Sequence, residues 1–132
     1  MTEAVAEGGI TGVEIFVARA GEIGEGERKL VRVEEWMVGV FRWRGRYYAY
    51  KNRCAHQGGP VCLGVLLGKV EAVLSADRDV IGERFSEQEM HLVCPWHGYE
   101  YEISTGICAA APELRLTAYP VVEREDGVYV RI

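Results

Sequence analysis

Two short stretches, Asn52-Arg-Cys-Ala-His-Gln-Gly-Gly-Pro60 and Cys94-Pro-Trp-His-Gly98, decide how this chain folds. Each contributes one cysteine and one histidine: Cys54 and His56 in the first, Cys94 and His97 in the second. Each stretch follows a run of strand character, so each pair is expected on a constrained loop at a sheet edge. The glycines after the histidines let the backbone fold closely around a bound group.

These residue types point to a metal centre. Thiolates are the usual ligands of iron–sulfur clusters, and a neutral imidazole can replace a thiolate on one iron, which raises the reduction potential. Two cysteines and two histidines can also hold zinc tetrahedrally. Zinc fingers usually place both cysteines in one knuckle and both histidines in another. The mixed Cys/His pairs therefore favour an iron–sulfur cluster, with zinc as the alternative.

The rest of the chain consists of short runs rich in aromatic and β-branched residues, separated by turns. The segment between the two loops is expected to be mostly loop, with polar stretches at 75–79 and 86–89 and room for one short helix within 63–89. The overall prediction is an antiparallel all-β domain. Strands are expected at 13–18, 29–34, 37–43, 47–50, 70–74, 90–93, 99–103, 115–123 and 128–132, with a tight hairpin at 44–46.

Composition narrows the function classes. The chain has 132 residues, of which 48% are hydrophobic, which suits one compact domain. Its net charge of −5 argues against non-specific nucleic-acid binding and would suit a partner with a basic docking patch. No apolar run reaches the roughly 18 residues that span a bilayer, and the first nine residues carry no leader pattern. The expected location is the cytoplasm, without membrane contact.

The two loops resemble the signature of the Rieske [2Fe–2S] family, Cys-x-His followed downstream by Cys-x-x-His. The resemblance covers roughly residues 12–132 and includes the glycines after each histidine, the Pro112 loop and the closing Tyr119-Pro-Val121. It implies a Rieske-like antiparallel β-sandwich or barrel, with a cluster-binding subdomain at about 52–112 and a loose tail at 1–11. It also implies that Cys54 and Cys94 hold an inner iron, and His56 and His97 an outer iron near the surface.

Three positions distinguish this chain from the Rieske proteins of respiratory quinol oxidation. Those proteins join the two loops by a disulfide, where this chain has Gly59 and Trp96. They also place a serine that donates to sulfur where this chain has Tyr99, whereas Tyr101 matches their tyrosine donor. With fewer donors, we expect a potential near roughly −150 mV, at the low end of the family range. We also expect the potential to fall at alkaline pH, where a ligand imidazole would lose its second proton.

The chain looks closest to the soluble Rieske ferredoxins of multicomponent oxygenases. That resemblance implies an electron carrier, not an enzyme, that accepts electrons from an NAD(P)H-dependent flavin reductase and delivers them to a terminal oxygenase. No small-molecule substrate of its own is expected, because His91 is the one spare histidine and cannot build a second iron site. The alternative is a small subunit bound inside a larger oxidoreductase, such as a nitrite reductase-like complex. The 37 residues between His56 and Cys94 keep that alternative open, because they exceed what a compact cluster-binding ferredoxin needs.

Four further side chains receive structural predictions. Cys62 and Cys108 are expected to be thiols in a reducing cytosol, with a bridge between them as the alternative. His91 is expected on a strand in a surface or packing role. Trp96, between two candidate ligands, is expected to shield the metal centre and to line the partner surface.

Overall fold

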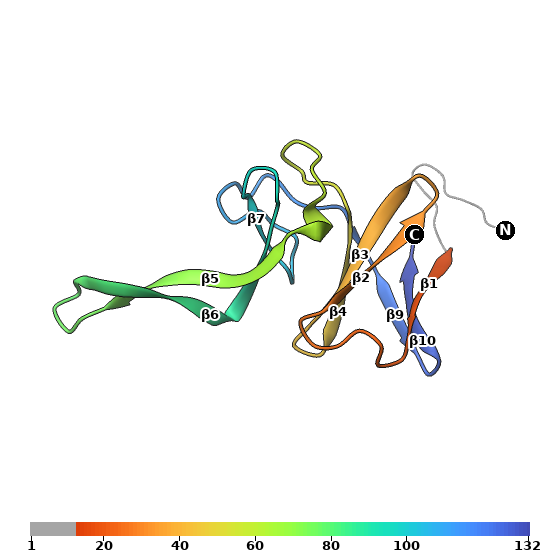
Figure 1. Cartoon of the computed structure of the whole chain (residues 1–132), viewed down its shortest axis with the longest axis horizontal. Coiled ribbons are helices and arrows are strands. Elements are labelled where there is room, and N and C mark those ends of the chain that lie inside the picture. Colours follow the sequence, from red (N-terminus) through yellow and green to blue (C-terminus); the bar gives the residue numbers. More distant parts are fainter. Residues whose placement is uncertain (1–12) are drawn as a thin grey trace.

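The computed structural model describes residues 13–132, which form ten strands and one 3-10 turn (Figure 1). The predicted tail at 1–11 lies outside the described residues. Within 13–132, no helix is long and apolar enough to cross a membrane. The elements are β1 Glu14–Arg19, β2 Arg28–Val33, β3 Trp36–Trp43, β4 Arg46–Lys51, η1 Val61–Leu63, β5 Val65–Leu74, β6 Val80–Val93, β7 Glu100–Glu102, β8 Ala118–Tyr119, β9 Val121–Arg124 and β10 Gly127–Arg131.

The strands form three antiparallel sheets, which confirms the all-β prediction. Their orders are β1-β10-β9, β2-β3-β4-β8 and β5-β6-β7. The first two sheets lie at one end of the molecule and the third lies at the other end (Figure 1). The predicted hairpin between β3 and β4 is confirmed, with Arg44 and Gly45 both at positive φ.

The sheet that contains β3 is buried on both faces and separates two hydrophobic cores. Val38 and Val40 point into the core shared with the β1-β10-β9 sheet. Phe41 points into the other core, which contains the third sheet and both loop cysteines. Gly39 faces the same way, and a Cβ there would lie 2.7 Å from the Cys62 sulfur. Strand alternation in β3 therefore gives each core its own set of side chains.

The segment 63–89 is the largest departure from prediction. The strand predicted at 70–74 is confirmed as part of β5. In place of the loop and short helix expected around it, β5 and β6 form a long antiparallel ribbon that leaves the body of the molecule (Figure 1). The predicted polar loop at 75–79 is confirmed as the ribbon's turn. The predicted loop at 86–89 is instead a bulge within β6, because the register jumps from Gly68↔Met90 to Val70↔Phe85. Pairing of 80–85 with 70–74 overrides the weak local strand pattern.

The strand expected at 115–123 is interrupted. Pro120 has no N–H group to continue a ladder, so β8 ends at Tyr119 and β9 begins at Val121. β8 pairs with β4, whereas β9 pairs with β10. The interruption lets the chain cross from one sheet of the sandwich to the other.

Candidate metal centre

The two Cys/His loops have nearly the same backbone hydrogen bonds. In the first, the Gly58 N–H donates to the Cys54 carbonyl at 2.8 Å, and the Cys54 N–H donates to Gly59 at 2.7 Å. In the second, Gly98 donates to the Cys94 carbonyl at 2.9 Å, and Cys94 donates to Tyr99 at 2.8 Å. Two unequal spacings, Cys-x-His and Cys-x-x-His, thus occupy closed turns of the same size.

Glycine is required in both turns. Gly58 has φ +79° and Gly98 has φ +75°, in the left-handed region where a Cβ is strained. The first loop follows β4, and the second follows β6 directly. The two loops therefore come from different sheets, and their cysteines meet in the same core.

The loops touch each other at Gly59 and Trp96, the positions where respiratory Rieske proteins were expected to have a disulfide. A Cβ at Gly59 would lie 2.7 Å from Trp96 Cδ2 and 2.8 Å from Cγ, inside van der Waals contact. Packing of an indole on bare backbone therefore joins the loops here. Trp96 is 56% exposed, so it lies at the surface and covers the loops only in part.

The four candidate ligands separate by depth. Cys54 and Cys94 are buried at 3% and 2% exposure, whereas His56 is half-buried and His97 is exposed. The two imidazole rings lie 5.1 Å apart between centroids and are perpendicular at 89°. The structure therefore brings all four predicted residues to one end of the third sheet, with sulfurs inside and imidazoles outside.

Tyr101 acts on the sulfur of Cys54. Its hydroxyl lies 3.0 Å from Cys54 Sγ and is fully buried. Burial opposes ionisation of this thiol, but the Tyr101 hydroxyl and the N–H groups of His56 and Gln57 lower the pKa of Cys54 below its usual value. Burial raises the pKa of Tyr101, so Tyr101 stays a neutral donor.

Cys94 has the opposite shift. Burial and the neighbouring Cys54 sulfur raise the pKa of Cys94, despite the N–H groups of Trp96 and His97 that point at it. Two buried sulfurs side by side cannot both become thiolates without a compensating positive charge. Among residues 13–132, Tyr101 is the one side chain with a hydroxyl bonded to either sulfur. Tyr99, at the other expected donor position, instead stacks on His56 with centroids 4.0 Å apart.

The donor set fits a two-iron cluster better than a single zinc ion. A zinc site needs four donors around one ion. In the part of the chain that the structure describes, no three His, Cys, Asp or Glu side chains converge on a single metal position. A pair of buried sulfurs and a separate pair of surface imidazoles instead suits two irons with two protein ligands each.

The other cysteines lie apart from this role. Cys62 and Cys108 are free and buried, so the bridge considered between them is not formed. Cys62 packs against Gly39, and burial raises the pKa of Cys62 to about 12, which keeps it a thiol.

His91 has an environment that its sequence position did not reveal. It is buried, and its Nδ1 lies 2.7 Å from a Glu100 carboxylate oxygen while its Nε2 lies 2.6 Å from Glu89. Burial opposes protonation, but the two carboxylates outweigh it and raise the pKa of His91. Glu89 and His91 are two residues apart on β6, so they lie on the same face of the strand, and this contact could have been predicted from the sequence. The contact with Glu100 could not, because Glu100 comes from β7.

Comparison with known proteins agrees with this geometry. The family model of the Rieske [2Fe–2S] domain matches residues 13–120. A human "Rieske domain-containing protein" is 32% identical over 92 residues, which cover 70% of this chain. The chain spans 48% of that protein, but it spans 94% of the 3-phenylpropionate/cinnamic acid dioxygenase ferredoxin subunit of Photorhabdus laumondii, to which it is 22% identical.

Two solved structures share the fold. The ferredoxin in the complex of reduced oxygenase and oxidized ferredoxin of carbazole 1,9a-dioxygenase has a TM-score of 0.64 and 23% identity, covering 90% of this chain and 93% of that one. A putative NADH-dependent nitrite reductase small subunit from Mycobacterium tuberculosis has a TM-score of 0.67 and 17% identity, covering 94% and 97%. Because the family model matches most of this chain, the chain belongs to the Rieske [2Fe–2S] family, and its cofactor is the [2Fe–2S] cluster of that family.

Proposed function

We propose that this protein carries single electrons on a Rieske [2Fe–2S] cluster held by Cys54, His56, Cys94 and His97. The observation that carries the proposal is the separation by depth: two sulfurs buried in a core and two imidazoles at the surface. When bound, the cluster supplies a one-electron couple. The protein's own residues then hold the ligands, exclude water from the sulfurs and present an edge that a redox partner can approach.

The surface imidazoles define where electrons would enter and leave. His97 lines an open hollow of about 590 Å³ together with Gly98 and Tyr99. His56 is held against the Tyr99 ring, which fixes its plane. A partner protein docked over this end would reach the ligands of one iron without disturbing the buried cysteines.

We propose a flavin reductase that uses NADH or NADPH as the electron donor and a terminal oxygenase as the acceptor. The ferredoxin–oxygenase complex of carbazole 1,9a-dioxygenase supports an acceptor of this class. The fold shared with a nitrite reductase small subunit supports the second candidate, a subunit bound inside a larger oxidoreductase. On either reading the chain is a carrier without a substrate of its own, and the cytoplasm stays its predicted location.

The ligand assignment is tested by metal analysis of purified protein and matched variants. We expect iron and acid-labile sulfide in equal amounts, and an electron paramagnetic resonance signal upon reduction. Cys54→Ser and Cys94→Ser should abolish both, whereas Cys62→Ser and Cys108→Ser should keep them, although all four thiols are buried. Zinc without sulfide in the wild-type protein would overturn the proposal.

The carrier role is tested by stopped-flow absorbance. The reduced protein should lose its reduced spectrum on mixing with a terminal oxygenase, and regain it with NADH plus a flavin reductase. Ligand-intact protein that exchanges electrons with neither class would contradict the role, even with the cluster present.

A further inference from the structure

The ribbon formed by β5 and β6 has an outer part, residues 70–85, that makes no side-chain hydrogen bond or ion pair with the rest of the described residues. Its base is tied to the body, because Arg44 donates to Gln88 Oε1 at 2.9 Å and Glu89 contacts His91 at 2.6 Å. β7 pairs with His91 to Val93 of β6, so residues 69–89, here called the arm, are a two-stranded ribbon. The arm projects from the body (Figure 1) and ends at the turn from Ser75 to Asp79. A two-stranded ribbon in water is marginally stable unless one face is covered.

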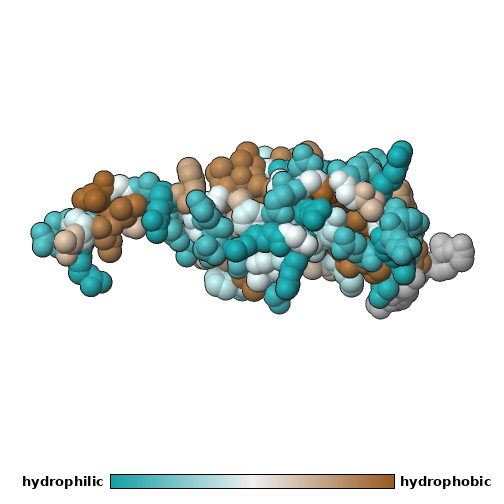
Figure 2. All heavy atoms as spheres, turned by 90° about the horizontal axis from the view of Figure 1, so that it is seen from below, coloured by the Kyte–Doolittle hydropathy of each residue, from teal (hydrophilic) through white to brown (hydrophobic). Residues whose placement is uncertain are grey.

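One face of the arm is apolar and open. The register places Val70 beside Phe85 and Leu74 beside Val80, with side chains on the same face, and Ile81 in an adjacent irregularity. Val80 and Ile81 are each 66% exposed, and Phe85 is 60% exposed. Figure 2 shows hydrophobic residues at the free end of the arm, away from the main body.

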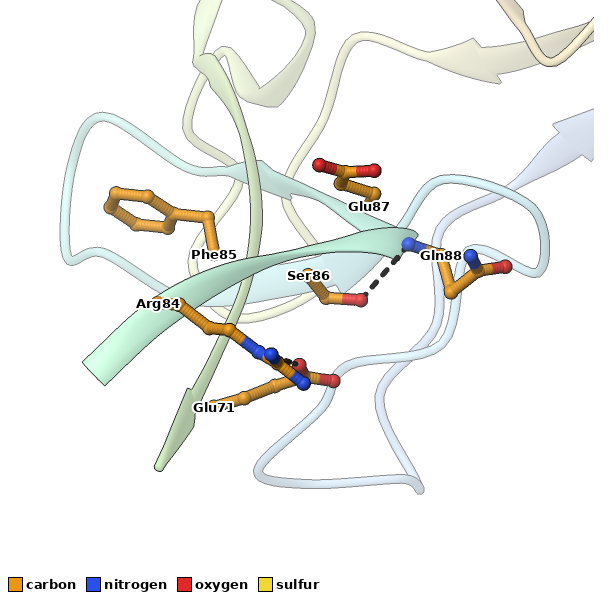
Figure 3. A pocket seen from close by; sticks show the side chains of 6 residues that line it. All are labelled: Glu71, Arg84, Phe85, Ser86, Glu87 and Gln88. Atoms are coloured by element: carbon orange, nitrogen blue, oxygen red, sulfur yellow. Dashed lines mark hydrogen bonds and ion pairs between the residues drawn. The ribbon is translucent and has the colours of Figure 1, made fainter. Parts of the chain in front are cut away.

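The opposite face carries the pair Glu71 and Arg84 next to Val73 and Gly82. Arg84 Nε lies 3.3 Å from a Glu71 carboxylate oxygen. Figure 3 shows this pair on one side of β6 and the Phe85 ring on the other. An exposed ion pair of this kind contributes little to stability, so it does not explain why the arm stays extended. An open apolar face on this outer part of the ribbon marks a contact surface.

Charge indicates what covers the apolar face. The arm has six acidic and three basic residues. Glu71 and Glu89 pair with Arg84 and Lys69, which leaves four acids and one arginine. Glu83 lies opposite Ala72, in the middle of the apolar face, and has no ion pair within residues 13–132. A second copy would bring the two Glu83 carboxylates into one apolar contact, whereas a partner with a basic residue there would pair with it.

The arm begins at the metal centre. Lys69 and Val70 line the same hollow as His97 and Tyr99. A protein seated on the apolar face near Val70 would therefore also lie over the surface histidine. The contact surface of the arm is continuous with the end of the molecule where electrons would pass.

We propose that the arm is a docking element that holds this chain on its redox partner. The partner is an oxidoreductase with an apolar groove that seats Val70, Leu74, Val80, Ile81 and Phe85 and carries a basic side chain opposite Glu83. The inference rests on the proposed electron-transfer function. In this proposal the arm provides the affinity for the redox partner, and electrons are exchanged at the histidines.

The test separates affinity from electron exchange. Fractions of the native host are screened for an oxidoreductase that oxidises the reduced, cluster-loaded full chain, and that enzyme is purified as the probe. The arm variants are the double substitution Val80→Ser/Phe85→Ser and the single Glu83→Lys. The matched controls are Phe16→Ser, a 50% exposed phenylalanine on β1, and Glu123→Lys on β9. Each variant is first checked for unchanged iron content and thermal midpoint.

The arm variants should raise the half-saturating concentration of the probe enzyme about tenfold at an unchanged limiting rate. The controls should stay within twofold of wild type. Arm variants that match wild type overturn the inference and leave the electron-transfer function intact. A wild-type dimer in sedimentation that the double variant converts to monomer also overturns it, in favour of a second copy. Failure of every fraction to oxidise the protein overturns both proposals.

Discussion

If Cys54 holds iron, removing the hydroxyl of Tyr101 should lower the reduction potential of the cluster by an amount that can be calculated. The hydroxyl is 3.0 Å from Cys54 Sγ in a fully buried position. Tyr101→Phe removes this donor and keeps the ring that fills the core. Nothing else in the fold needs to move.

The expected shift follows from the charge of the two oxidation states. A hydrogen bond to a charged group is worth about 1.5–3 kcal/mol. Both states keep the thiolate, but the reduced state carries one more negative charge, so we take about 1 kcal/mol as the difference between them. For a one-electron couple, about 59 mV corresponds to a tenfold change, so the potential should fall by roughly 40 mV.

The assay is a redox titration of the loaded protein, followed by absorbance and electron paramagnetic resonance. Tyr50→Phe is the matched control, because Tyr50 is equally buried in the same core and donates to the Ile103 carbonyl at 2.6 Å instead of to sulfur. Both variants should lose about 1 kcal/mol of unfolding free energy. A potential that rises in Tyr101→Phe, or that falls equally in Tyr50→Phe, would refute the reasoning.

Three further predictions concern the surroundings of the site. Gly59→Ala should lower the unfolding free energy by about 1–3 kcal/mol, because its Cβ would press on the indole; adding Trp96→Ala should restore most of the loss in chemical denaturation. Tyr99→Leu removes the ring stacked on His56, so it should broaden the electron paramagnetic resonance spectrum while iron content is unchanged; an identical spectrum would contradict the positioning role. The raised pKa of His91 means that its ion pairs are intact below about pH 6.5 and are lost as pH rises through the folded value. Stability in urea should therefore decline towards alkaline pH more steeply in wild type than in His91→Gln, and parallel profiles would count against the ion pairs.

The sequence predicted those features of this protein that depend on neighbouring residues in the chain. Cys54 and Cys94 could be assigned to two loops because glycines and strand patterns surround them, and the fold class followed from the density of β-branched and aromatic residues. For Gly59 and Trp96, the sequence showed only that no disulfide can form between the two loops at these positions; it did not show that the two residues touch. The contact itself, an indole on bare backbone, depends on two loops meeting in space.

One strand of the arm was predicted at 70–74, but its partner at 80–85 was not, and the reason is physical. Residues 80–85 hold Gly82, Glu83 and Arg84 between apolar ends, a pattern too weak to specify a strand without its partner. Pairing across the turn supplies the missing hydrogen bonds. The Glu100 contact of His91 was hidden similarly, because it joins β6 to β7 through the register of a sheet.

The shared sheet has a consequence for how the protein loses its structure. Val38 and Val40 on one face of β3, and Phe41 on the other, belong to different cores but to one strand. Melting either core therefore exposes the back of the other, and the two halves should unfold in a single cooperative transition. Iron bound at the loops would then act as a ligand of the whole folded chain, raising the melting temperature of the distant β1-β10-β9 sheet as much as that of the loops themselves.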